Sequence, residues 1–367
     1  IFEMASGKTY YSFKTKKDYK DFLTKMSSFP DIIDSIIENM REGIKKKYVL
    51  SKILAIKLYD QLNDAIKNKI FLQKNIKIKL DLDFNAQLEC IFIYKTKELI
   101  QFLKKEYIPK CINSTNKIGL CYLPNGVEEY KFLVKASLSK NISIETIHQY
   151  GLSEVARIHN EKKKIKELMG FKGTLQDFDV YLKKRKDLKF SSKDELLDTY
   201  KKEVQKINRT IMKQYFNEPI KNKCSVESVP KYNEPFSSEA YYMPGDIEGK
   251  RTGKFYINLR DYRDNSRIDV EALTLHEANP GHHYQITHNN EQDRFPLFLK
   301  CYNNETYCEG WALYCENLGD YKTHESYYGK LNMEMVRALR LVVDTGIHYY
   351  GWGFNKTFKL MRNYLFE

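Results

Sequence analysis

The sequence lacks long apolar segments and paired cysteines. Without a run of about 18 apolar residues, no transmembrane helix is expected. The seven cysteines are odd in number and show no CxxC spacing, which argues against a disulfide framework and a thiolate zinc site. No basic segment followed by an apolar stretch opens the chain, so no signal peptide is visible. These absences predict a cytoplasmic protein in a reducing compartment with no membrane partner.

The charge balance is basic, with a formal net charge of +13. Such a charge can indicate a nucleic-acid partner. Here the lysines are scattered over the whole chain, which is also rich in Asn, Ile and Tyr, so a general composition bias explains the charge. No helix-turn-helix, zinc-finger or RNA-binding signature is present. We therefore predict no specific nucleic-acid partner, and the pattern does not indicate an oligomeric state.

Residues 16 to about 216 are predicted to be mainly helical. Apolar residues recur at three- and four-residue spacing between positions 32 and 68, which is typical of amphipathic helices. Side chains that can cap helix N-termini indicate where further helices begin. These capping positions are Ser143, Thr174 with Asp177, and Ser192 with Glu195. The helix that begins after Ser143 is predicted to run to about Met169.

The pattern changes near residue 224. Segments 224–229, 240–242 and 253–259 are predicted strands, and the helical pattern returns near Val270. We therefore predict a mainly α protein of one domain. A helical region spans about 1–220, and a catalytic region spans about 221–367 with a small β-sheet ahead of the active-site helix. Because strand 253–259 lies just before that helix, we also predict that it binds extended peptide as an edge strand.

Six of the eight histidines lie between residues 276 and 348. His276 and Glu277 end an apolar helix and are soon followed by further histidines, which is the pattern of zinc peptidases. In such sites two histidines hold the metal, and the glutamate takes a proton from the metal-activated water. Glu277 is therefore our candidate general base.

The spacing of these histidines departs from the regular i, i+4 pattern. Position i+4 from His276 is Pro280, while His282 and His283 stand at i+6 and i+7. On one continuous helix these positions lie too far along the axis to share a metal with His276. Proline and the following Gly281 break helices, so we predict that the chain folds back here. Either His282 or His283 then becomes the second ligand.

A second acidic helix follows over residues 304–316. Glu305, Glu309 and Glu316 stand at i, i+4 and i+11 and share one face, while Trp311 and Tyr314 are predicted to pack inward. A glutamate here completes a His₂Glu site with one position left for water. We predict one Zn²⁺ per chain with Glu309 as the third ligand, although such a site also accepts Mn²⁺, Co²⁺ or Fe²⁺.

Three sequence blocks carry a family resemblance. They resemble the HExxPGHH, EGWALYxE and RAxRLVVDTGIH motifs of the family named domain of unknown function 885, which is similar to thimet oligopeptidase and Taq carboxypeptidase. The resemblance covers nearly the whole chain and is most specific over 240–352. It implies a mainly helical gluzincin-like fold with a deep cleft that holds zinc. The blocks are His276-Glu-Ala-Asn-Pro-Gly-His-His283, Glu309-Gly-Trp-Ala-Leu-Tyr-Cys-Glu316 and Arg337-Ala-Leu-Arg-Leu-Val-Val-Asp-Thr-Gly-Ile-His348.

The resemblance also implies roles for single residues. It makes His276, His282 and Glu309 the ligands and Glu277 the general base. Aligning the Gly-His pair of the motif favours His282, and His283 then supports the site or faces substrate.

Three further residues are candidates for catalysis. His348, in the third block, is a candidate for stabilising the oxyanion. Of Arg337 and Arg340, one can pair with Asp344 and the other can hold a substrate carbonyl or carboxylate, and we assign the second role to Arg340. Tyr242 is a candidate donor to the tetrahedral intermediate.

These inferences together predict a zinc metallopeptidase that hydrolyses short peptides. The alternatives are a metal-dependent amidase or isopeptidase acting on another amide, and a catalytically silent binding protein with the same fold. Members of the family continue to a segment containing PGQALxYK, and this sequence ends before it. We therefore expect the family's C-terminal end to be missing from residues 1–367.

Overall fold

The computed structural model of the chain divides into two compact units. The first unit comprises Ile1–Tyr130 with Ile347–Lys356, and the second comprises Lys131–Gly346 with Thr357–Glu367. The division falls near residue 130, whereas the predicted catalytic region begins at about residue 221. The single domain predicted over residues 1–367 stays a prediction. The structure describes residues 13–69, 83–138, 140–231, 234–302 and 304–365.

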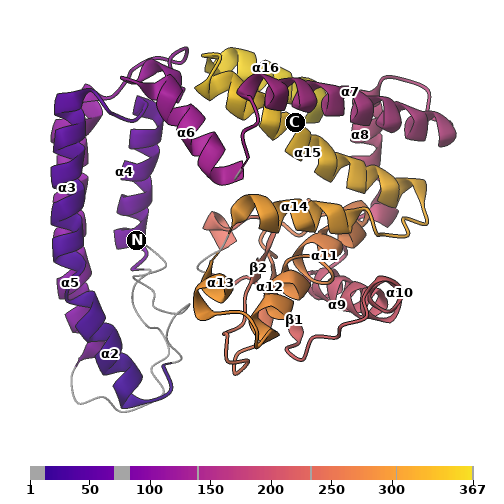
Figure 1. Cartoon of the computed structure of the whole chain (residues 1–367), viewed down its shortest axis with the longest axis horizontal. Helices are drawn as coiled ribbons and strands as arrows, with labels where there is room; N and C mark the ends of the chain where they lie inside the picture. Colours follow the sequence, from indigo (N-terminus) through magenta and orange to yellow (C-terminus); the bar gives the residue numbers. More distant parts are fainter. Residues whose placement is uncertain (1–12, 70–82, 139, 232–233, 303, 366–367) are drawn as a thin grey trace. The chain divides into compact units, whose positions relative to one another are not determined.

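The first unit is built from helices, drawn in indigo to purple in Figure 1. Helices α2, α3 and α4 each pack against α5, and their apolar faces form one core around Phe22, Leu62 and Phe92. Residues 70–82 of the predicted helical region lie outside the described residues. The helices are α2 (Lys16–Met26), α3 (Phe29–Lys46), α4 (Lys52–Lys67), α5 (Phe84–Phe102), a π-helical turn (Leu103–Tyr107), 3₁₀ turns (Ile108–Lys110 and Leu120–Tyr122) and the start of α6 (Gly126–Leu138).

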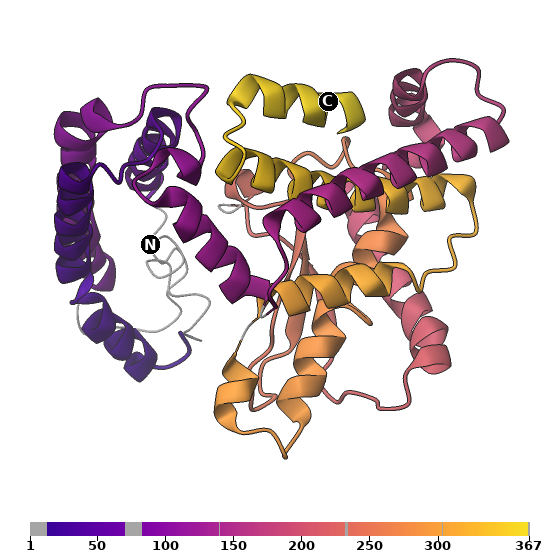
Figure 2. The same ribbon diagram turned by 45° about the horizontal axis from the view of Figure 1, so that its top comes forward.

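The second unit holds the remaining elements, drawn from magenta to yellow (Figures 1 and 2). Its helices are α7 (Ile144–Leu168), α8 (Leu175–Lys184), α9 (Lys193–Arg209), α10 (Ile211–Tyr215), α11 (Val270–Glu277), α12 (His282–Glu291), α13 (Leu297–Cys301), α14 (Glu305–Glu316), α15 (His324–His348, whose last two residues belong to the first unit) and α16 (Phe354–Leu365, whose first three do). Short 3₁₀ turns lie at Lys186–Leu188, Glu234–Phe236 and Arg267–Asp269.

The predicted helix caps are present. Ser143 accepts a hydrogen bond from the Thr146 N–H at the start of α7, and Thr174 forms a reciprocal capping box with Asp177 at the start of α8. Ser192 caps α9, but the Glu195 carboxylate accepts from the neighbouring Ser191 N–H, so the reciprocal half of that box is shifted by one residue.

A three-stranded sheet precedes the helix that carries His276. Its order is β1-β3-β2, with β1 (Cys224–Ser228) parallel and β2 (Ala240–Met243) antiparallel to β3 (Gly253–Ile257). The prediction of a mainly α protein with a small sheet is confirmed. The prediction that segment 253–259 is an edge strand is wrong, because β3 pairs on both sides. Its backbone groups are used within the sheet and cannot pair with an added peptide strand.

The sheet positions α11. Alternate side chains of β3, Phe255 and Ile257, are buried and form a core with Tyr200 of α9 and Leu273 of α11. Both views show α11, α12 and α14 gathered beside the sheet (Figures 1 and 2). The core therefore fixes the helix on which the candidate metal ligands begin. Within the described residues, no helix is both long and apolar enough to cross a membrane.

Candidate metal site

The last turn of α11 carries His276 and Glu277. Nearly every residue of this short helix is buried, because it lies between α9, the sheet and α14. His276 is 2% exposed and Glu277 is 9% exposed. Buried polar side chains need partners, so the neighbours of these two residues define the site.

The break predicted at Pro280 and Gly281 is present, and it brings His282 back to His276. Helix α11 ends at Glu277, and α12 begins at His282. A Cβ atom on Gly281 would lie 1.9 Å from the His276 carbonyl oxygen and 2.4 Å from that of Leu275, so only glycine allows this close return. The rings of His276 and His282 consequently have centroids 4.7 Å apart, instead of the axial rise of about 9 Å that six helical residues would give.

Helix α14 supplies the third side chain. Asn304 caps this helix by accepting from the Tyr307 N–H, and Trp311 donates its Nε1–H to the Pro280 carbonyl oxygen over 2.8 Å. These contacts hold the helix against the break. Glu309 then lies with Oε2 at 3.5 Å from His276 Nε2 and Oε1 at 3.6 Å from His282 Nε2.

The chemistry and spacing of these three side chains fit a zinc ion. One ligand atom from each of His276, His282 and Glu309 lies within 4.8 Å of the others. Atoms bound to a tetrahedral zinc at ~2.1 Å are about 3.4 Å from one another, close to the two distances measured to Glu309. The structure thus brings together the three predicted ligands, and His282 is the histidine of the pair that faces His276.

Glu316 orients His276 from the opposite side of the ring. Its Oε1 is 2.8 Å from His276 Nδ1, and the residue is fully buried. A carboxylate at Nδ1 holds a proton there, so Nε2, which faces Glu309 and His282, is the nitrogen that a metal would bind in place of a proton. Arg337 Nη2 lies 3.7 Å from the same carboxylate oxygen and contributes positive charge to it. The sequence had made Glu316 a rival to Glu309, and the structure gives it this supporting position instead.

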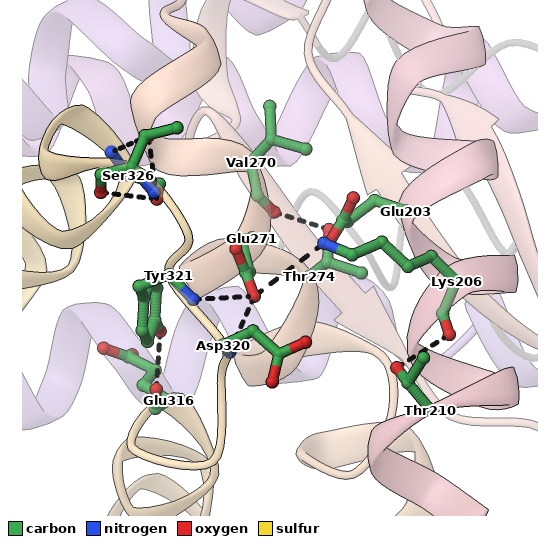
Figure 3. Close-up of polar contacts among 11 residues, drawn as sticks. Glu203, Lys206, Thr210, Val270, Glu271, Thr274, Glu316, Asp320, Tyr321 and Ser326 are labelled. Atoms are coloured by element: carbon green, nitrogen blue, oxygen red, sulfur yellow. Dashed lines mark hydrogen bonds and ion pairs between the residues drawn. The ribbon is translucent and has the colours of Figure 1, made fainter.

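A second set of contacts ties the end of α14 to α11, as Figure 3 shows. Glu271, in the first turn of α11, accepts hydrogen bonds at Oε1 from the N–H groups of Asp320 (3.0 Å) and Tyr321 (3.4 Å). Lys206 of α9 lies 3.9 Å from that oxygen, and the Tyr321 hydroxyl donates to the Glu316 carbonyl oxygen. The loop after α14 is thereby fixed to the helix that carries His276.

Comparison with known proteins assigns the family. The model of a family described as a bacterial protein of unknown function (DUF885) matches residues 2–367. The chain belongs to the DUF885 family. The predicted family is therefore confirmed, and a search of curated proteins found no match.

A solved structure also resembles this DUF885 chain. It is described as the putative lipoprotein from Colwellia psychrerythraea, with a TM-score of 0.86 and 25% sequence identity. The match covers 96% of this chain and 64% of the other, so this chain spans less than two thirds of that protein. The cytoplasmic location of this DUF885 chain stays a prediction.

The electrostatics of the DUF885 site couple its three central side chains. Burial by itself lowers the pKa of His276, but hydrogen bonds with Glu309 and Glu316 outweigh it and raise that pKa to about 9. The hydrogen bond with His276 lowers the pKa of Glu309 to about 2, and burial lowers the pKa of His282 to about 4. A proton on His276 therefore competes with any cation bound by these three groups.

Glu277 is a buried carboxyl directly after His276. Burial raises the pKa of its carboxyl above the ordinary value, and His276 opposes the rise, while the nearby Glu309 charge adds to it. A carboxylate with a raised pKa accepts a proton more readily than an exposed one, and the role of general base stays a prediction.

His283 and Tyr242 contact each other. The Tyr242 hydroxyl lies 2.9 Å from His283 Nδ1, and His283 is 1% exposed. Burial raises the pKa of the Tyr242 hydroxyl and lowers that of His283 to about 4. The pair links β2 to the start of α12, so His283 supports the position of the neighbouring His282. The catalytic role predicted for Tyr242 stays a prediction.

Two predicted catalytic residues are not brought to the three-ligand cluster by any described contact. Arg340 is exposed on α15, and the arginine of that helix that approaches the site is Arg337. His348 lies in the first unit, where its Nδ1 accepts from the Leu120 N–H and its ring stacks on Tyr130. Their roles in catalysis stay predictions.

The prediction that Tyr314 packs inward is wrong. Its side chain is 58% exposed, because it lies on the outer face of α14.

Proposed function

We propose that this chain is a zinc-dependent metallopeptidase of the gluzincin type. The observation that carries the proposal is the convergence of His276 and His282 on Glu309, with Glu277 adjoining the first histidine. A His₂Glu set is a donor combination of catalytic zinc sites, and it leaves one coordination position for water. His276, His282 and Glu309 would hold the metal.

Each residue around the metal has a separate role in the proposed hydrolysis. Bound zinc would lower the pKa of a water molecule toward ~7 and polarise the substrate carbonyl. The Glu277 carboxylate accepts the proton of the attacking water and passes it to the nitrogen of the leaving amine. Glu316 keeps the His276 proton on Nδ1, so that Nε2 is available as a ligand.

Short peptides are the substrates that we propose, held in a deep cleft of the kind found in the gluzincins named above. This part of the proposal rests on the family resemblance. The arrangement of two histidines, a third carboxylate and a buried neighbouring carboxylate supports the hydrolytic chemistry itself.

The test combines metal content with peptide cleavage on four proteins. Zinc is measured by elemental analysis in the wild-type chain and in Glu309→Ala, Glu277→Gln and Glu305→Ala. The last is the matched control, because Glu305 is exposed on α14 one turn before Glu309. Cleavage is measured on a library of short peptides.

We expect about one zinc per chain in the wild type, in Glu277→Gln and in Glu305→Ala, and none in Glu309→Ala. Cleavage is expected in the wild type and in Glu305→Ala, and chelator should abolish it. Absence of metal from the wild type would refute the proposal. Zinc without cleavage of any peptide would refute the peptidase activity and favour an amidase acting on another amide.

A further inference from the structure

A cavity of about 580 Å³ lies between α12, α13, α14 and the loop after β2. This volume falls within the ~300–1,000 Å³ range of small-molecule sites in proteins. The apolar part of its lining includes Ile247, Ile286, Phe295, Leu299 and Tyr307, and the polar part consists of four amide side chains and one lysine. The cavity therefore has an extended apolar side.

The cavity and the metal ligands share two helices. Ile286 stands four residues after His282 on α12, one helical turn away and on the same face. On α14, the lining residue Cys308 directly precedes Glu309. Residues that line the cavity and residues that would hold the metal are therefore neighbours along both helices, about one turn (~5.4 Å of axial rise) apart on α12. This closeness along the helices is the reason for placing the cavity beside the bond that would be hydrolysed.

The polar groups around the cavity are suited to a peptide. Among the described lining residues Lys300 carries the formal charge, and its Nζ donates to the Asn290 carbonyl oxygen over 2.7 Å. Gln285 donates from Nε2 to the Tyr307 carbonyl oxygen, and the amide side chains of Asn289, Asn290 and Asn304 complete the polar part of the lining. Amide groups can both donate hydrogen bonds to and accept them from the backbone of a peptide.

The outer wall of the cavity is held in place. Asn289 of α12 donates to the Leu299 carbonyl oxygen of α13 over 3.4 Å, and the Lys300 bond to Asn290 joins the same two helices. Short helix α13 is thus fixed against the end of α12. Leu299 faces the cavity and is 40% exposed, while Leu297, two residues earlier, is 66% exposed and is not part of the lining.

We propose that this cavity binds a bulky apolar side chain of the substrate, such as that of Phe or Leu, on a residue adjoining the hydrolysed bond. The inference rests on the proposed peptidase function for the position of the scissile bond. The apolar side of the cavity favours such a side chain, and a cationic side chain would lose its hydration there beside the Lys300 ammonium.

Equilibrium binding tests this pocket separately from hydrolysis. The full chain carrying Glu277→Gln, in buffer containing Zn²⁺, is titrated calorimetrically with acetyl-Gly-Gly-Phe-Gly-Gly-amide and with the same peptide containing Lys in place of Phe. The titrations are repeated after adding Leu299→Asn or Leu297→Asn. The two leucines receive the same substitution on the same helix, and thermal unfolding checks that each variant folds.

We expect the Phe peptide to bind at least ~10-fold more tightly than the Lys peptide. Leu299→Asn should reduce that ratio to below about threefold, and Leu297→Asn should leave it unchanged. Equal affinity for both peptides, no binding of either, or an equal loss in both leucine variants would overturn the inference.

The same measurements separate the two proposals. If Glu277→Gln selects the Phe peptide but the wild-type protein hydrolyses no peptide, the proposed pocket is supported and the proposed peptidase function is refuted. If the wild-type protein hydrolyses peptides but Glu277→Gln does not select the apolar side chain, the proposed peptidase function is supported and the proposed pocket is refuted.

Discussion

The substitution Gly281→Ala should disable the metal site without touching a ligand. The new Cβ would lie 1.9 Å from the His276 carbonyl oxygen, whereas real Cβ atoms essentially never approach closer than 3.0 Å. The chain at the break must therefore move by about 1 Å, and His282 moves with it. Metal–ligand distances tolerate only ~0.2 Å. Losing a supporting partner of a ligand costs about 10–100-fold in affinity, so displacing a ligand should cost at least ~100-fold, or about 2.7 kcal/mol.

The assay is competition for Zn²⁺ with a chromophoric chelator, combined with thermal unfolding. Gly310→Ala is the matched control, because this glycine adjoins Glu309 and a Cβ added there meets no atom within 4 Å. Inside helix α14, alanine should stabilise the fold by about 1 kcal/mol and leave the zinc affinity unchanged. If Gly281→Ala bound zinc within threefold of the wild type, the argument that glycine is required for the return of His282 would be refuted.

Three further substitutions test the surroundings of the site and the core. Glu316→Gln should lower zinc affinity about 10–100-fold, measured by the same competition, because the carboxylate at His276 Nδ1 is lost. Glu271→Ala should cost about 1–3 kcal/mol in chemical denaturation by removing the acceptor of two backbone N–H groups, and no loss would contradict that role. Lys162→Met should cost about 3–5 kcal/mol, because it leaves Asp179 buried 3.7 Å from the missing charge. Burial already raises the pKa of Asp179, and Lys162 opposes the rise. The stability that the variant loses relative to the wild type should therefore be smallest below pH ~4 and grow as pH increases, since only the unfolded carboxyl of Asp179 ionises freely there. Denaturation between pH 3 and 8 measures this, and a double substitution that also replaces Asp179 with Leu should recover most of the loss.

Local features of the fold could be predicted from sequence because their causes are local. Ser143 and Thr174 begin helices through hydrogen bonds to residues three positions away, and such pairs are visible in the sequence. The order of the strands is different, because it depends on which segments meet across the fold. The residues of segment 253–259 predict a strand, but they do not determine whether it lies at the edge or in the centre of the sheet. The structure places it in the centre.

The metal site, like the fold, could be predicted from the sequence only in part. The His276-Glu277 pair, the break and Glu309 were visible as motifs with chemical meaning. The residues alone left His282 and His283 open, because the choice depends on the direction in which α12 leaves the break, and Gly281 sets that direction through a contact with the backbone of α11.

The supporting contacts were harder to find. The role of Glu316 has a weak signal in its spacing of seven from Glu309, which places both on one helical face. Glu271 shows no signal, since its partners are backbone N–H groups nearly 50 positions away.

The hydrogen bond from Trp311 to Pro280 also makes the protein its own optical reporter. The chain has two tryptophans: Trp311 in the second unit and Trp352 in the first, where the Lys356 ammonium lies 3.9 Å from the centre of its ring. Replacing Trp352 with Phe would leave a single indole whose donor atom touches the break between the two histidines. Its emission would then follow the arrival of a metal ion, or the loosening of α14, in real time and without any added dye.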